Sequence, residues 1–137
     1  LNKRIKFLDE VIRQTSLKNI ETLHARAEDY AKNRDYREKF DVCVSRAVAN
    51  LSTLSEYCIP YVKVGGCFIA YKAGQLDEEL KSAERAVKLL GGEIADVHRL
   101  TLPDTDIDRT FVVIKKTAAT SKKYPRKAGL PAKEPLQ

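Results

Sequence analysis

An arginine follows a short apolar strand near the middle of the sequence, and its position suggests a binding role. Val42 to Val44 form a β-branched run that ends in the polar pair Ser45 and Arg46, after which apolar residues recur at helical spacing. Ligands of open α/β sheets bind in the crevice at the carboxyl ends of the strands. An arginine there can bind a carboxylate or stack on a planar ring, although it can equally be a salt-bridge partner.

Two further candidates follow other predicted strands. Ala27 and Glu28 come directly after an alternating stretch at 20–25, where Glu28 can alternatively be the opening acid of a helix. Lys72 ends an apolar run at 67–71, so it should face the same crevice as Arg46 and can meet a phosphate there. It can also be an ordinary surface lysine.

Several kinds of catalytic site find no support in the sequence. Gly65-Gly66 precedes a strand and Gly91-Gly92 ends a helix, so neither pair has the strand–loop–helix context of a phosphate-binding loop. His24 and His98 lie in predicted strands far apart in sequence, without a nucleophile elbow, and are interpreted as structural or surface histidines. Because no cluster has metal-ligand spacing either, we predict no metal site.

Basic residues gather toward the end of the chain, which carries a formal net charge of +6. Four of them are candidates for phosphate contacts with a polyanionic partner, and Tyr124 is available to stack: Lys122, Lys123, Arg126 and Lys127. The alternative is a solvated, disordered tail. Since residues 121–137 hold three prolines and show no periodicity, we predict an extended basic tail over 118–137, following a folded domain over 1–117.

Helices and strands alternate along the rest of the chain. Helices are predicted over residues 2–15, from about 50 to 62 with a stop or kink at Pro60, and over 75–90, with a weak helix or loop at 28–39. Strands are predicted over residues 20–25, 40–45, 67–71, 93–102 and 111–116, with a turn at 64–66. The alternation predicts an α/β fold whose mostly parallel sheet has helices on both faces and ends in an antiparallel hairpin.

The composition is that of one globular domain. The chain has 137 residues, of which 43% are hydrophobic and 32% charged. No apolar run reaches membrane-spanning length, and no segment reads as a signal peptide. Three cysteines without metal spacing indicate buried thiols and a reducing, cytoplasmic location. Since the chain starts on a helix and contains no methionine, we expect the first strands of the sheet to lie upstream of Leu1.

Four segments in register resemble the glucose-inhibited division protein B family. They are residues 2–8 (NKRIKFL), 26–29 (RAED), 45–49 (SRAVA) and 123–133 (KYPRKAGLPAK). Members of that family are small-subunit ribosomal RNA methyltransferases G, which transfer a methyl group from S-adenosylmethionine to N7 of a guanine in 16S RNA. The resemblance implies a Rossmann-like class I methyltransferase fold and a partner that is 16S rRNA or the small ribosomal subunit.

The resemblance also assigns roles to residues. Ala27 and Glu28 match the pair that contacts the adenine of the cofactor, and Arg46 matches the arginine of the cofactor site. The glycine-rich loop and the first two strands of a seven-stranded sheet would lie upstream of Leu1, so we expect the isolated chain to be inactive. N7 of guanine carries a lone pair and no proton, so methylation requires no general base and we predict no catalytic residue.

Two alternatives stay open at this point. The chain can be a non-catalytic RNA-binding or ribosome-assembly domain of Rossmann-like fold that has lost the cofactor loop. Less favoured is another Rossmann-like nucleotide-binding domain, because the basic tail argues for RNA. A glycine-rich loop in the sequence upstream would favour the methyltransferase. The exact guanine, the state of the RNA substrate and the oligomeric state are not predictable from these residues.

Overall fold

The computed structural model describes residues 2–46, 49–74 and 76–137. Ala47 and Val48 of the SRAVA segment, and position 75 where a helix was expected to begin, lie outside the described residues. The elements in chain order are α1 (Asn2–Thr15), α2 (Ala27–Tyr30), β1 (Phe40–Arg46), α3 (Leu51–Cys58), the 3₁₀ turn η1 (Ile59–Tyr61), β2 (Val62–Lys72), α4 (Asp77–Leu89), β3 (Gly92–Thr101), β4 (Asp108–Lys116) and α5 (Leu130–Lys133).

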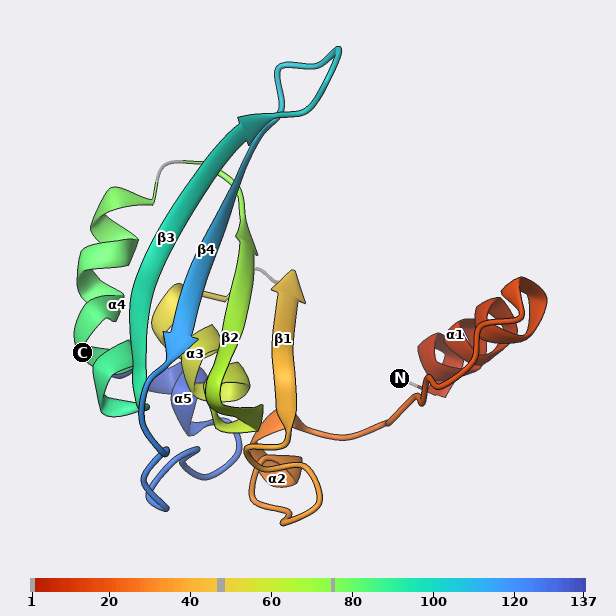
Figure 1. Cartoon of the computed structure of the whole chain (residues 1–137), viewed down its shortest axis with the longest axis horizontal. Helices are drawn as coiled ribbons and strands as arrows, with labels where there is room; N and C mark the ends of the chain where they lie inside the picture. Colours follow the sequence, from red (N-terminus) through yellow and green to blue (C-terminus); the bar gives the residue numbers. More distant parts are fainter. Residues whose placement is uncertain (1, 47–48, 75) are drawn as a thin grey trace.

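A four-stranded mixed sheet in the order β1-β2-β4-β3 forms the centre of the molecule (Figure 1). β1 and β2 pair in parallel, whereas β4 is antiparallel to both β2 and β3. Three of the four strands therefore run in the same direction, and β3–β4 is the predicted antiparallel hairpin. As a result, the carboxyl ends of β1, β2 and β3 meet at one edge of the sheet.

The hydrophobic core lies between one face of this sheet and the helices α3 and α4 (Figure 1). Phe68 and Ala70 of β2 and Val112 and Ile114 of β4 are at most 1% exposed, as alternation along the two strands requires. They pack against apolar residues of the two helices and their ends: Leu51, Leu54, Ile59, Ala83, Val87 and Leu90. α3 ends at Cys58, immediately before the turn that contains Pro60, as predicted.

Two expectations for the first 30 residues were wrong. Residues 20–25 form no strand, because a strand needs a neighbour for its hydrogen bonds and no described strand lies beside this stretch. The helix over 2–15 forms, but α1 stands apart from the sheet (Figure 1). Its apolar stripe does not face the core, since Phe7 is 66% exposed and Leu8 46%.

The predicted turn at 64–66 lies inside β2 instead. Gly65 adopts a φ of +93°, and the pairing of β1 with β2 jumps from Phe40↔Val62 to Val42↔Cys67. The glycines therefore make an irregularity within one long strand. A Cβ atom on Gly66 would overlap the backbone carbonyl of Asp41, so only glycine allows the two strands to approach here.

The predicted extended tail is folded against the body of the protein. Residues 118–137, called the docked segment below, contain α5 and pack beside α3. Thr120, Pro125 and Pro131 are buried, and the Thr53 hydroxyl donates to the Pro131 carbonyl at 2.9 Å. Specific hydrogen bonds hold this segment, which explains why it showed no hydrophobic periodicity. In the described ranges, no helix is both long and apolar enough to cross a membrane.

Candidate functional site

A cavity of about 690 Å³ opens at the carboxyl ends of β1 and β2, where the sequence predicted a binding crevice. Arg46 is the last residue of β1, is exposed and lines this cavity. Lys72, the last residue of β2, lines it as well. The other lining residues are Tyr71, Ala73, Glu79, Leu102, Arg109 and Phe111.

Lys72 is held by protein partners. Its Nζ donates to the Ala49 carbonyl at 2.8 Å and forms an ion pair with Glu79 at 2.6 Å, and its side chain is only 10% exposed. Glu79 also accepts a hydrogen bond from the Leu51 amide at 2.6 Å. Lys72 therefore ties the end of β2 to the start of α3 and to α4, which leaves Arg46 as the more accessible cation of the two.

Ala27 and Glu28 lie away from this crevice. The Tyr61 hydroxyl donates to the Ala27 carbonyl at 2.7 Å. Tyr61 is followed by Val62, the first residue of β2, which pairs with Phe40 at the start of β1. α2 therefore sits near the amino ends of β1 and β2, opposite the edge that carries Arg46 (Figure 1). Burial raises the pKa of Tyr61 to about 12, helped by nearby thiols and carboxylates.

The Glu28 side chain faces the docked segment. It is 7% exposed, and its carboxylate accepts a hydrogen bond from the Gly129 amide at 3.0 Å. A neighbouring arginine, Arg37, donates to four backbone carbonyls: those of Ala31, Thr120, Ser121 and Tyr124, at 2.9–3.1 Å. The α2 region and the docked segment are thus joined into one folded junction.

Arg126, predicted as a phosphate contact, is the centre of a buried ion pair in this junction. Its guanidinium donates to both oxygens of Glu56, at 2.9–3.2 Å, and to the Glu134 carbonyl at 2.6 Å. Glu56 is fully buried, and its hydrogen bonds raise the pKa of Arg126. The other three predicted contacts, Lys122, Lys123 and Lys127, are exposed on the same segment.

Sequence reasoning missed an aromatic pair in the crevice. Tyr71 of β2 and Phe111 of β4 are register partners, and their ring centroids lie 4.7 Å apart. Both follow strand alternation onto the sheet face opposite the core, and Arg109 is two positions from Phe111 on that face. Only the cross-strand register brings these residues together. Among the described residues, no group of three or more His, Cys, Asp or Glu side chains is arranged to hold a metal.

Comparisons with known proteins agree with this fold. Residues 1–111 match the family described as rRNA small subunit methyltransferase G (GidB). The chain is 53% identical over 136 residues to the ribosomal RNA small subunit methyltransferase G of Lactobacillus johnsonii, covering 99% of this chain and 57% of that protein. It is 54% identical to the protein of the same name from Lachnoclostridium phytofermentans, with 99% and 56% covered. The chain thus spans little more than half the length of these relatives.

Solved structures show the same Rossmann-like methyltransferase fold at low sequence identity. The M. jannaschii TYW2 structure, in complex with AdoMet, matches with a TM-score of 0.58 at 12% identity, over 82% of this chain and 53% of that one. The M1.HpyAVI–SAM complex matches with a TM-score of 0.51 at 13% identity, over 72% and 54%.

Proposed function

Because the chain belongs to the rRNA small subunit methyltransferase G family, we propose that it forms part of an S-adenosylmethionine-dependent enzyme that methylates N7 of a guanine in 16S ribosomal RNA. The observation that carries the proposal is identity of 53% over 99% of the chain to a relative of that name. The partner is the small-subunit RNA or its particle, and the place of action is the cytoplasm, where that RNA is made and used.

The crevice suits part of such a cofactor. Arg46 supplies a guanidinium that can pair with a carboxylate or stack on a planar ring. The adenine-contact role of Ala27 and Glu28 stays a prediction based on the resemblance, since the Glu28 carboxylate is bonded to Gly129 here. S-adenosylmethionine supplies an activated methyl group on a sulfonium when bound.

The protein then contributes to the reaction by aligning the guanine base with the methyl group. N7 of guanine presents an in-plane lone pair and loses no proton when it is methylated, so the residues around the crevice must orient the base and exclude water without moving a proton. This requirement agrees with a crevice lined by arginine and aromatic side chains.

A chimera tests the proposal: this chain replaces the matching 136 residues of the Lactobacillus johnsonii relative. We expect it to methylate 16S RNA and Arg46→Ala to weaken cofactor binding about ten- to hundredfold, because a charge-assisted contact is lost. Isothermal titration with S-adenosylmethionine and methyl-transfer kinetics are the measurements, with Arg85→Ala on the exposed face of α4 as control. RNA binding without methyl transfer would instead support the non-catalytic alternative, and unchanged kinetics would remove Arg46 from the site.

The three exposed lysines of the docked segment are proposed as phosphate contacts. Replacing Lys122, Lys123 and Lys127 with glutamine in the chimera should lower the slope of log K against log salt for RNA binding by about 2, since each contact to a single strand contributes about 0.7. The control replaces three exposed lysines in or beside α1, Lys3, Lys6 and Lys18, with the same change in net charge. Equal slopes for the two triple variants would show that the docked segment makes no specific phosphate contact.

A further inference from the structure

The Tyr71–Phe111 pair lies on the sheet face that α3 and α4 leave uncovered. Their strand neighbours Ala70 and Val112 are completely buried in the core, so alternation directs both rings to the other face. Tyr71 is 39% exposed, and the two rings are tilted by 59° with both lining the 690 Å³ cavity. The pair therefore presents aromatic surface to a ligand at the carboxyl edge of the sheet.

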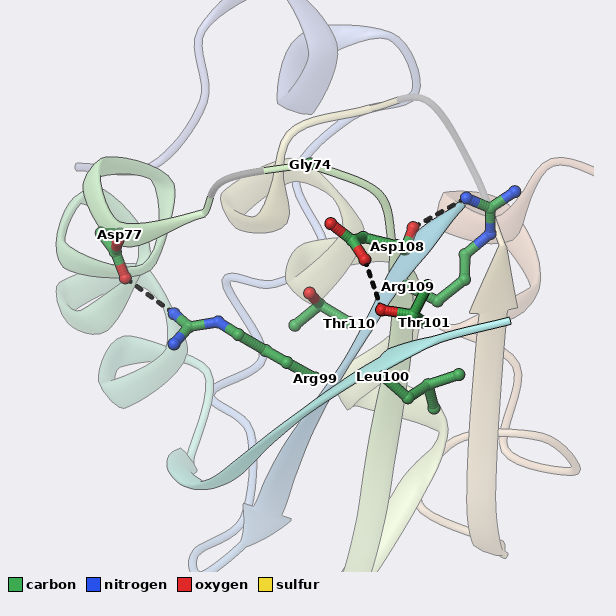
Figure 2. A pocket seen from close by; sticks show the side chains of 8 residues that line it. All are labelled: Gly74, Asp77, Arg99, Leu100, Thr101, Asp108, Arg109 and Thr110. Carbon is green, nitrogen blue, oxygen red and sulfur yellow. Dashed lines mark hydrogen bonds and ion pairs between the residues drawn. The ribbon is translucent and has the colours of Figure 1, made fainter. Parts of the chain in front are cut away.

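Guanidinium groups flank the aromatic pair. Arg46 is the register partner of Tyr71 on β1. Arg109, on β4, lines the same cavity and also the adjoining one of about 500 Å³ beside the β3–β4 hairpin. Figure 2 shows that Arg99 extends toward Asp77, with which it pairs at 2.8 Å. Arg109 lies on the other side of β4 and donates to the carbonyl of its neighbour Asp108. Of the two hairpin arginines, Arg109 is thus the one whose charge is not neutralised by a carboxylate in the described part of the chain.

Aromatic rings with a cation beside them match the chemistry of a single nucleotide, which has a planar base and a charged phosphate. Proteins that bind unpaired RNA stack its bases on aromatic side chains and bind its phosphates with arginine or lysine. Enzymes that act on a base also have to take it out of its stack. The pairing of Arg46 with Tyr71 across β1 and β2 brings the proposed cofactor residue next to the aromatic surface, as a transfer between two ligands requires.

We propose that the guanine to be methylated stacks on the Tyr71–Phe111 pair and that Arg109 binds a phosphate of the same RNA strand. This inference rests on the proposed function and adds to it the residues that hold the substrate. It assigns a role to three residues that the resemblance does not cover.

The aromatic pair is tested in the chimera with Tyr71→Leu and Phe111→Leu, which keep apolar volume but remove a stacking surface. Each should lower kcat/KM for RNA about tenfold, because stacking on one aromatic side chain is worth about 1–3 kcal/mol per base. Cofactor affinity should stay unchanged, and Tyr71→Phe, which keeps a ring, should recover most of the kcat/KM that Tyr71→Leu loses. Tyr36→Leu is the control, since Tyr36 belongs to an aromatic pair with Phe40 at the opposite end of β1. Wild-type kcat/KM for both leucine variants would overturn the inference, as would equal losses in cofactor affinity.

A binding measurement separates this inference from the proposed function. A short oligouridine with one 2-aminopurine in its middle loses fluorescence when that base stacks on an aromatic ring. Quenching by the chimera that Tyr71→Leu abolishes supports the stacking surface even if no methyl transfer is detected, and quenching that survives in both leucine variants overturns it. For the phosphate, Arg109→Met should reduce the salt slope of RNA binding by about 0.7, whereas Arg99→Met should not change it. Equal slopes for these two variants would remove Arg109 from the proposal.

Discussion

Replacing Arg126 with methionine is expected to lower the free energy of unfolding of the chain by about 3–5 kcal/mol, since removal of one partner leaves a buried charge without compensation. Glu56 is fully buried, and Arg126 donates to both of its oxygens from the guanidinium and to one from its backbone amide. Without the guanidinium, the Glu56 carboxylate keeps only one of these partners. Urea denaturation at neutral pH measures the effect.

The matched control is Arg99→Met, which breaks the exposed ion pair with Asp77. Exposed pairs contribute about 0–1 kcal/mol, so this variant should remain close to wild type. A double variant, Glu56→Met with Arg126→Met, removes both charges and should recover most of the stability lost in the single variant. A loss in Arg126→Met no larger than that in Arg99→Met would show that the Arg126–Glu56 pair does not stabilise the fold.

Lys116 is expected to make the chain more stable as the pH rises from 8 to 10. Its side chain is buried, with Nζ bonded to the Ile59 carbonyl at 3.0 Å and to the Thr120 hydroxyl at 2.6 Å. Burial lowers the pKa of Lys116 to about 8 from 10.5, although Glu38, with an oxygen 3.8 Å away, opposes the shift and Arg37 adds to it. The folded lysine thus loses its proton at a lower pH than the unfolded one does.

The direction of this change in stability with pH follows from proton binding. Between pH 8 and 10.5 the unfolded chain holds a proton at this lysine that the folded chain has released, so unfolding takes up a proton and becomes less favourable as the pH rises. A shift of this size corresponds to about 3 kcal/mol at most. Above pH 10 the raised pKa of Tyr61 acts in the opposite direction, because the unfolded tyrosine ionises first.

Comparison with Lys116→Met isolates the lysine, since the tyrosines and the thiols contribute to both curves. Cys58 is one such group, because its hydrogen bond with Cys43 and its burial raise its pKa. The difference in unfolding free energy between wild type and Lys116→Met should grow in favour of wild type from pH 8 to 10. Parallel curves over this range would mean that Lys116 titrates alike in the folded and unfolded chains.

The elements that carry a regular apolar pattern were predictable from the sequence. The strand at 111–116, with Val112 and Ile114 buried, and α4, with Ala83 and Val87 buried, show the periods of the face that they bury. The run at Val42–Val44 predicted its strand through its apolar, β-branched residues alone, since Val42 and Val44 are 51% and 59% exposed. The stretch at 20–25 has an alternating pattern too, but a strand also needs a partner, and sequence alternation does not supply one. The prediction of an extended tail over 118–137 was wrong. The docked segment is held by hydrogen bonds that Arg37 donates and that Glu28 and Glu56 accept, and such contacts leave no periodic signal.

The candidate site was predictable only in part. A strand that ends in Arg46 indicates a crevice residue without knowledge of the tertiary structure. The ion pair of Lys72 with Glu79 depends on how α4 packs, and the contact of Tyr71 with Phe111 depends on the register between β2 and β4. Pairings between distant segments of this kind are not encoded in local spacing.

The four carbonyl contacts of Arg37 also bear on the order of events during biosynthesis. Three of its partners lie 83 to 87 positions further along the chain, so the ribosome finishes every strand of the sheet before Arg37 can form these bonds. Until then Glu56 lacks the hydrogen bonds from Arg126 that satisfy its buried carboxyl group in the complete chain. Native contacts of such long sequence separation close late. Products that terminate before residue 120 should therefore be more open to proteases than the full chain is.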